Sequence, residues 1–448
     1  MNHILITNAL LINEEITYTA DLIVRGDRIA GIFSPGEAPS HKEATVIDAR
    51  GMWLIPGVID DQVHFREPGL TYKGDINSES AAAAAGGVTS FMEMPNTIPQ
   101  TVTVKEWQKK NELASGKSFV NYSFYLGATD VNGDELLKAD TASVPGIKLF
   151  LGASTGNMLV GSENALDVIF SIKKLPIACH CEDEKIIKAN LAAYREKYGD
   201  DIDPSFHPLI RSREACLASS TAAVTRAVRS GTRLHLLHLS TAEETELLTP
   251  GTDPSSKQIT AEACVHHLWF DDSSYLDKGN LIKCNPAIKK ASDREALINA
   301  VKNDTIDVIA TDHAPHTLAE KSAPYFSAPS GNPMVQHSLV MMLELCHRGI
   351  LTPELVVRKM CHNPAIIFNI RERGFIRTGY KADLVIVDPA APWTVSTDNI
   401  MYKCGWSPLE GTTFRSRVVT TIVNGTPVIM KGRLTGMRTP EMLSFDRK

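Results

Sequence analysis

Eight short apolar runs recur through the middle of this 448-residue chain, and this rhythm constrains the fold more than any other feature. Most of the runs are separated by stretches with helical character, and they occupy residues 57–64, 88–94, 119–126, 146–151, 175–181, 233–239, 258–265 and 306–312. Strands that alternate with helices form parallel sheets, because the chain must cross back between consecutive strands. Eight such units over roughly 310 residues predict an α/β fold, a (β/α)8 TIM-type barrel spanning residues 54–374.

Glycines mark the ends of the expected helices between these strands. Residues 77–85 are closed by Gly86 and Gly87, and residues 211–230 are closed by Gly231. A glycine that adopts the left-handed conformation ends a helix without steric cost. These expected helix ends support the division of the chain into alternating strands and helices.

The sequence pattern at the two chain ends differs from that of the middle. Short β-like runs such as residues 20–24, 382–388 and 418–425 are bounded by Gly, Pro, Asn or Asp. Such punctuation is typical of antiparallel strands joined by turns. We therefore expect residues 1–53 and 375–448 to form one small β-sandwich domain together.

Charge and composition exclude several function classes. The net charge is −6, acidic and basic residues are interspersed, and no Lys/Arg block is dense enough to neutralise a row of phosphates. No run of 18 apolar residues occurs, the first residues lack a signal-peptide pattern, and eight cysteines are too sparse for a disulfide scaffold. We expect a cytoplasmic protein that acts on a small molecule, without a nucleic-acid or membrane partner; a homodimer is one possible assembly.

Polar residues that end the apolar runs are the candidates for chemistry, because active sites of such barrels lie at the carboxyl ends of the strands. In the first run Asp60, Gln62 and His64 alternate, so they share one strand face. The later runs contribute Lys148, His180, His235, His238, His266, His267, Asp312 and His313.

Each of these residues alone is weak evidence. A single histidine near a strand end is more often a hydrogen-bonding residue than a metal ligand. A regular strand directs only one of His235 and His238 into the barrel, and the same holds for His266 and His267. Lys148 lies within an apolar strand, where burial lowers the pKa of the amine. A neutral amine reacts with carbon dioxide to give a carbamate, an anionic ligand able to bridge two metals.

The combined order of these residues resembles the amidohydrolase superfamily, and the detailed motifs are similar to those of its dihydroorotase family. The matching segments are residues 56–69, 94–97, 147–150, 284–286, 311–316 and 379–384. Among these, the run Arg66-Glu67-Pro68-Gly69 is the most specific. The resemblance covers nearly the whole chain.

This resemblance implies a reaction and a set of roles. The expected activity is reversible cyclisation of N-carbamoyl-L-aspartate to L-dihydroorotate in pyrimidine biosynthesis, with one or two Zn²⁺ per chain. By the same resemblance, N6-carboxylated Lys148 bridges two metals, His180 and His238 hold one, and His64 with Asp312 holds the other. Asp312 is also the expected catalytic proton shuttle.

Substrate contacts follow from the same resemblance. Arg66 and Asn96 are expected on the substrate carboxylate, and Asn285 and His316 on its ring. A planar guanidinium suits a carboxylate, because it donates two parallel hydrogen bonds. The segments 322–333 and 155–156 are expected to cover the pocket, and residues 328–331 to offer backbone groups to the substrate.

Two positions depart from the family pattern. Gln62 replaces the first of two histidines on the first strand, and an amide oxygen is a much poorer zinc ligand than imidazole. Lys289 stands where relatives usually have arginine. Two alternatives therefore stay open: a hydantoinase, dihydropyrimidinase or allantoinase type of cyclic amidohydrolase, or a catalytically silent barrel that is a structural partner of aspartate carbamoyltransferase.

Overall fold

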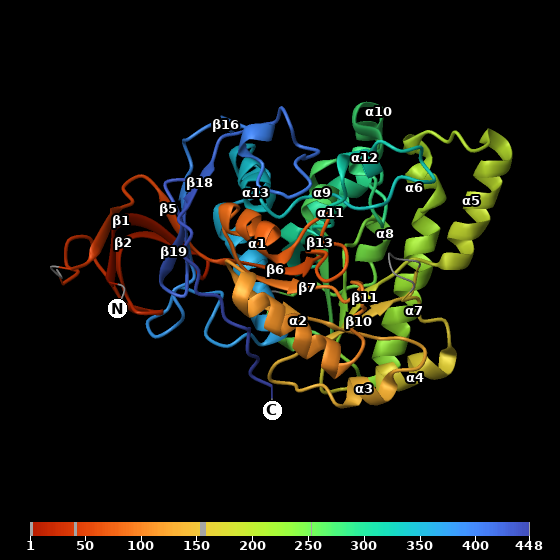
Figure 1. The fold of residues 1–448 in the computed structure, drawn as a ribbon, viewed down its shortest axis with the longest axis horizontal. Helices are drawn as coiled ribbons and strands as arrows, with labels where there is room; N and C mark the ends of the chain where they lie inside the picture. Colours follow the sequence, from red (N-terminus) through yellow and green to blue (C-terminus); the bar gives the residue numbers. More distant parts are fainter. Residues whose placement is uncertain (1–2, 40–42, 153–157, 252, 448) are drawn as a thin grey trace.

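The computed structural model describes residues 3–39, 43–152, 158–251 and 253–447. A β-rich part built from both chain ends lies beside a larger barrel whose outer helices extend away from it (Figure 1). The α/β class and the barrel predicted from the sequence are confirmed, since each of the eight expected runs contains an observed strand.

The barrel strands run parallel to their neighbours. They are β6 (Val58–Val63), β7 (Val88–Glu93), β8 (Asn121–Phe124), β9 (Leu126–Gly127), β10 (Ile147–Phe150), β11 (Ile177–His180), β12 (Leu234–Leu236), β13 (Ile259–Cys264) and β14 (Val308–Ala310). Strands β6 to β8 form one ladder, and β9 to β14 form another. The third strand of the barrel is interrupted at Tyr125. Its first part, β8, belongs to one ladder and its second part, β9, to the other.

Contacts between the first and last strands close the barrel. A parallel bridge joins Val63 to His313, and the backbone N–H of His64 donates to the carbonyl of His313 at 2.7 Å. The hydroxyl of Thr311 donates to Oδ2 of Asp60 at 2.6 Å. The ends of β6 and β14 are thus held together directly beside His64 and Asp312.

Helices cover the outside of the barrel. The longer ones are α1 (Ile76–Ala85), α2 (Val104–Lys117), α4 (Glu163–Ser171), α5 (Glu184–Tyr198), α7 (Arg213–Ser230), α11 (Ala291–Lys302) and α13 (Ser338–His347). Short helices include α3 (Gly133–Leu137), α6 (His207–Ile210), α8 (Ala242–Thr245), α9 (Val265–Trp269), α10 (Tyr275–Lys278), α12 (Leu318–Lys321), α14 (Pro353–Val357) and α15 (Asn363–Phe368). Helix α7 ends at Gly231, whose φ of 71° is the left-handed cap expected from the sequence.

The strands from the two chain ends form one nine-stranded sheet. They are β1 (His3–Asn13), β2 (Ile16–Arg25), β3 (Arg28–Phe33), β4 (Thr45–Asp48), β5 (Trp53–Pro56), β15 (Leu384–Asp388), β18 (Arg417–Val423), β19 (Thr426–Met430) and β20 (Arg433–Leu434). Short strands β16 (Trp393–Thr394) and β17 (Thr413–Phe414) pair separately. The sheet has its own apolar core, and β5 extends past the boundary expected at residue 53.

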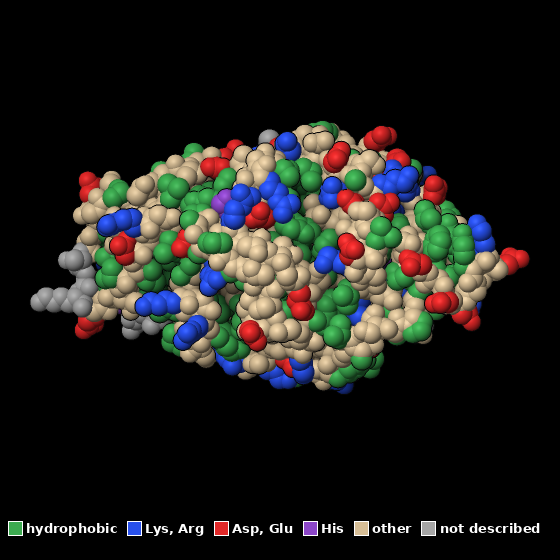
Figure 2. Space-filling view, turned by 90° about the horizontal axis from the view of Figure 1, so that it is seen from above, with side chains coloured by type: hydrophobic (Ala, Val, Ile, Leu, Met, Phe, Trp, Pro, Cys, Tyr) green, Lys and Arg blue, Asp and Glu red, His purple; other side chains and the backbone are tan. Residues whose placement is uncertain are grey.

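The surface carries charges of both signs. On the face shown in Figure 2, Lys and Arg side chains are scattered among Asp and Glu side chains. Among the described residues, no helix is long and apolar enough to cross a bilayer.

Candidate active site

A cavity opens at the carboxyl ends of the barrel strands and gathers nearly all the residues to which the family resemblance assigned a role at the site. Its lining consists of Gln62, His64, Arg66, Asn96, Lys148, Phe150, His180, His238, Asn285, Asp312, Ala314, Ser330 and Gly331. These residues come from positions more than 260 residues apart in the chain. Of the expected site residues, only His316 lies outside this lining.

His180 and His238 converge on one point of the cavity. Nδ1 of His180 lies 2.9 Å from Nε2 of His238, and Nε2 of His180 lies 3.1 Å from Oε2 of Glu182. Burial lowers the pKa of both imidazoles, and His238 falls well below its usual value. The Glu182 carboxylate favours the proton on Nε2 of His180. Neutral rings with converging nitrogens are suitable metal ligands.

A second group is formed by His64, Asn96 and Asp312. Nδ1 of His64 donates to Oδ1 of Asn96 at 2.8 Å, because an amide oxygen can only accept. The other ring nitrogen, Nε2, lies 3.0 Å from Oδ1 of Asp312. Burial lowers the pKa of His64. The unprotonated Nε2 and the Asp312 carboxylate therefore face the same space and could hold a cation together.

Lys148 lies within β10 and is 1% exposed. Its Nζ has no hydrogen-bond partner among the described residues and lies 4.4 Å from the centre of the Phe150 ring. Burial lowers the pKa of this amine from 10.5 to about 8. An orphaned, partly neutral amine in a cavity beside two groups of side chains that could hold a metal is chemically unusual, because a buried polar group without a partner is costly.

Three cavity residues have left-handed backbone conformations, which residues other than glycine rarely adopt. The φ angles are 70° for Arg66, 40° for His238 and 46° for Asp312. Each residue follows shortly after a barrel strand. Such conformations cost on the order of 1–3 kcal/mol each and concentrate at functional sites.

Arg66 lines the cavity and is held in position by two contacts. Its Nε donates to the carbonyl of Pro315 at 3.0 Å, and its Nη2 lies 2.9 Å from Nε2 of His316. The other ring nitrogen of His316, Nδ1, lies 2.9 Å from Nζ of Lys73. Burial lowers the pKa of Arg66 to about 10, so the guanidinium stays charged at neutral pH. His316 thus contacts Arg66, which lines the cavity, and is itself outside the cavity lining.

The segment 322–333 forms part of the cavity wall through Ser330 and Gly331. The buried amine of Lys321 donates to the carbonyls of Pro329 and Gly331 at 2.9 Å. A Cβ added at Gly331, whose φ is 137°, would approach the Ala314 carbonyl oxygen to 2.6 Å. The wall is therefore anchored by a lysine and requires glycine at this position. The other expected cover, residues 155–156, lies outside the described residues.

The paired histidines that the sequence left open are now distinguished. His238 lines the cavity, whereas His235 lies in the barrel interior beside Asp61 and Glu262. Strand β12 ends at Leu236, so His238 belongs to the following loop and strand alternation no longer applies to it.

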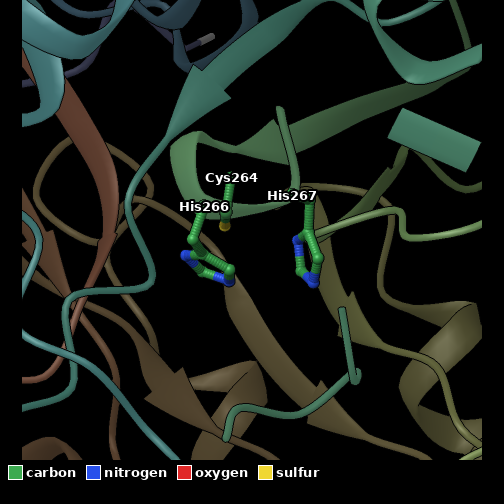
Figure 3. Close-up of side chains that lie close together, drawn as sticks. All are labelled: Cys264, His266 and His267. Carbon is green, nitrogen blue, oxygen red and sulfur yellow. The ribbon is translucent and has the colours of Figure 1, made fainter. Parts of the chain in front are cut away.

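His266 and His267 lie in the first turn of helix α9, and Figure 3 shows them beside Cys264. Their donor atoms and the Cys264 sulfur all lie within 4.8 Å of one another, so this group could also hold a metal. Burial lowers the pKa of His267 to about 4 and that of His266 well below its usual value. Nε2 of His267 donates to the carbonyl of Pro286 at 3.0 Å, which ties α9 to the loop that carries Asn285.

Two glutamates that the sequence did not single out support the histidines. Glu182 lies behind His180 and forms an ion pair with Arg211; although burial opposes it, Arg211 and His180 hold the pKa of Glu182 at about 2. Oε1 of Glu262 accepts from the backbone N–H of His238 at 3.0 Å. Both glutamates lie two residues from a strand-end residue, and only their tertiary contacts reveal them.

The two departures from the family pattern differ in position. Gln62 is 1% exposed and lines the cavity. Its Oε1 accepts a hydrogen bond from the Cys264 thiol at 3.7 Å. Lys289 is buried outside the cavity lining and donates to the carbonyl of Ala287 at 3.1 Å. Only the substitution at Gln62 changes the donor atoms that face the cavity.

Comparison with known proteins yields a consistent set of relatives. The amidohydrolase family model matches residues 53–428. A dihydroorotase of Halobacterium salinarum is 35% identical over 393 residues, covering 87% of this chain and 89% of the relative. A dihydroorotase of Methanothermobacter thermautotrophicus is 30% identical over 391 residues, covering 87% of this chain and 86% of the relative.

Solved structures share the fold over the full length. The L-hydantoinase (dihydropyrimidinase) from Arthrobacter aurescens superimposes with a TM-score of 0.92 at 26% identity, covering 99% of this chain and 100% of that chain. A dihydropyrimidinase from Brevibacillus agri gives a TM-score of 0.88 at 21% identity, covering 100% of both chains. The second likeness concerns the fold alone.

Proposed function

Because the chain belongs to the amidohydrolase family, we propose that it is a zinc-dependent dihydroorotase, which interconverts N-carbamoyl-L-aspartate and L-dihydroorotate in pyrimidine synthesis. The observation that carries this proposal is the cavity in which Arg66 and Asn96 lie beside His64, Lys148, His180, His238 and Asp312. It combines donors for a metal with a fixed guanidinium for a carboxylate. The curated relatives that bear the name dihydroorotase cover most of the chain.

The donor atoms of the cavity fit zinc. His180 and His238 present converging nitrogens, and His64 presents Nε2 beside the Asp312 carboxylate. Imidazole nitrogens and carboxylate oxygens are the ligands that zinc prefers among these residue types. When bound, zinc supplies Lewis acidity, which polarises a carbonyl oxygen and makes water more acidic.

We assign Lys148 the role of a carbamate ligand. The lone pair of its neutral amine attacks the carbon of carbon dioxide, one proton leaves the nitrogen, and an anionic carboxylate is formed on Nζ. The buried, unpartnered Nζ supports this assignment. The added carboxylate oxygens would bind metal ions, and these ions would be the partners that this end of the side chain lacks. The lowered pKa supplies the neutral amine that the reaction requires.

Asp312 manages the proton of the reaction. In hydrolysis its carboxylate takes a proton from the attacking water, and it returns that proton to the ring nitrogen as the amide C–N bond breaks. Ring closure follows the same path in reverse, so it begins with Asp312 protonated. Cyclisation should therefore be favoured at lower pH than hydrolysis.

Arg66 and Asn96 bind the substrate carboxylate, and Asn285 faces the ring. The guanidinium of Arg66 is oriented by Pro315 and His316 before substrate arrives, which lowers the entropic cost of binding. Oδ1 of Asn285 is buried without a hydrogen-bond partner among the described residues, so it is available to a substrate N–H. His316 acts with Arg66 at the edge of this site.

Turnover of dihydroorotate, hydantoin, dihydrouracil and allantoin by the purified protein tests the proposal. We expect dihydroorotate to be preferred strongly, because the ring of hydantoin or dihydrouracil carries no carboxylate for Arg66. Preference for one of the neutral rings would indicate a hydantoinase or dihydropyrimidinase, and preference for allantoin an allantoinase. Inactivity towards all four in zinc-loaded protein would favour a silent structural partner of aspartate carbamoyltransferase.

A further inference from the structure

A second group of potential metal ligands lies inside the barrel, outside the residues that line the cavity. It consists of Asp61 on β6, His235 on β12 and Glu262 on β13, and each of the three is at most 1% exposed. Their donor atoms all lie within 4.8 Å of one another. Strand β6 belongs to one sheet and β12 and β13 to another, so these side chains meet only because the barrel is closed.

The distances in this group are longer than those of typical charge-assisted hydrogen bonds. Nε2 of His235 lies 3.2 Å from Oδ2 of Asp61 and 3.6 Å from Oε2 of Glu262. Charge-assisted N–H to O contacts are usually ~2.7–2.9 Å long. Ligands of a tetrahedral zinc at about 2.0–2.1 Å, in contrast, lie roughly 3.3 Å from one another. The observed distances between donor atoms, 3.2 and 3.6 Å, are close to those expected for ligands of one tetrahedral ion.

The donor atoms also have no other partners. Among the described residues, none forms a hydrogen bond with either carboxylate oxygen of Asp61, with Nε2 of His235 or with Oε2 of Glu262. Buried polar atoms are nearly always paired, so four orphaned atoms at one place require an explanation.

Neighbouring groups orient two of the side chains towards the common point. The Thr260 hydroxyl donates to the carbonyl of Leu234 at 3.5 Å, so its oxygen accepts from Nδ1 of His235 at 2.8 Å. With Nδ1 bonded to Thr260, Nε2 is the ring atom that faces both carboxylates. Oε1 of Glu262 is occupied by the backbone N–H of His238, which leaves Oε2 for the group. Such supporting contacts are typical of metal ligands.

The geometry points to a divalent metal site, occupied by Zn²⁺, formed by Asp61, His235 and Glu262 in the barrel interior. The two carboxylates can supply two negative charges, which a divalent ion offsets. The ion joins the first strand of the barrel to the sixth and seventh. Through Glu262 it also fixes the backbone of His238. The presence of an ion at this site can be measured whether or not the proposed reaction is confirmed.

Anomalous diffraction at the zinc edge tests this site in crystals of the full chain soaked with Zn²⁺. We expect a peak at about 2.0–2.2 Å from Oδ2 of Asp61, Nε2 of His235 and Oε2 of Glu262. Absence of a peak there overturns the proposal, whether or not zinc is found beside Lys148. The result is therefore separable from the outcome for the proposed enzyme activity.

Zinc content of two matched variants gives a second measurement. Asp61→Asn should bind one zinc per chain fewer than the parent, because an amide oxygen is a poor ligand. Asp60→Asn changes the adjacent buried carboxylate, which contacts Thr311 and lies outside the group, and should keep the parent content. Equal zinc content in Asp61→Asn and the parent contradicts the proposal. If Asp61→Asn does not fold, the diffraction experiment on the parent still decides.

Discussion

Asn96 accepts a 2.8 Å hydrogen bond from Nδ1 of His64, and this contact decides which nitrogen of His64 faces the cavity. The proton is held on Nδ1, so Nε2 is left as a lone pair beside Asp312. A residue that the sequence assigned to substrate binding thus also orients an expected metal ligand.

Asn96→Ala should therefore reduce metal retention as well as substrate binding. Loss of such a supporting hydrogen bond lowers metal affinity by ~10–100-fold. Asn285→Ala is the matched control, because Asn285 lines the same cavity and its Oδ1 accepts no hydrogen bond among the described residues. We expect both variants to raise KM, and only Asn96→Ala to lose zinc at lower chelator concentration. Identical zinc retention in the two variants would contradict the role of Asn96.

Arg66→Lys should weaken substrate binding and leave the zinc content unchanged. Lysine keeps the charge and cannot donate two parallel hydrogen bonds, so kcat/KM for dihydroorotate should fall by about 10- to 100-fold, or roughly 1.5–3 kcal/mol. Arg50→Lys, at an exposed position far from the cavity, serves as the control. If Arg66→Lys turns over dihydroorotate like the parent, Arg66 is only a structural residue that binds Pro315 and His316.

Asp312→Asn should lose turnover in both directions. General acid–base catalysis contributes ~10²–10⁴-fold, and an amide can neither accept nor return the proton. The rates of hydrolysis and of ring closure are measured separately on protein of known zinc content. Hydrolysis within tenfold of the parent rate in a zinc-loaded variant rules out Asp312 as the proton carrier.

Formation of the carbamate on Lys148 should depend on pH. The neutral amine reacts, and it becomes scarcer as pH falls below the pKa of about 8. At pH 7 about one amine in ten is neutral, compared with roughly one in three thousand for an ordinary lysine. Metal-free protein given zinc and bicarbonate should regain activity faster as pH rises towards 8, with little further gain above about pH 9. A rate that stays equal between pH 6 and pH 8 would refute this dependence.

Gln62→His should add a tightly held zinc. Gln62 and His64 both line the cavity, so an imidazole at position 62 would face the same space as His64. In the parent, the position served by His64 and Asp312 lacks that imidazole, and we expect it to lose metal first. Zinc per chain is measured against chelator concentration for both proteins. Simultaneous loss of two ions from the parent, or no gain in the variant, would show that Gln62 or the nearby Cys264 already replaces the missing ligand.

The sequence by itself determined the barrel, the order of its strands and the residues at their carboxyl ends. Apolar periodicity is a local property, and parallel strands bring their carboxyl ends to one edge wherever the intervening loops lie. For that reason His64, Lys148, His180 and Asp312 could be located in the chain before their contacts were known.

Only the tertiary structure decided that His238 lines the cavity and that His235 does not. It also placed both His266 and His267 outside the cavity lining and showed which residues support the site. The choice between His235 and His238 depends on the end of β12 at Leu236, and strand ends are set by long-range pairing. The contact between His316 and Arg66 and the group of Asp61, His235 and Glu262 join residues separated by 27 to 250 positions. Closure of the barrel creates these contacts, and no local sequence pattern encodes them.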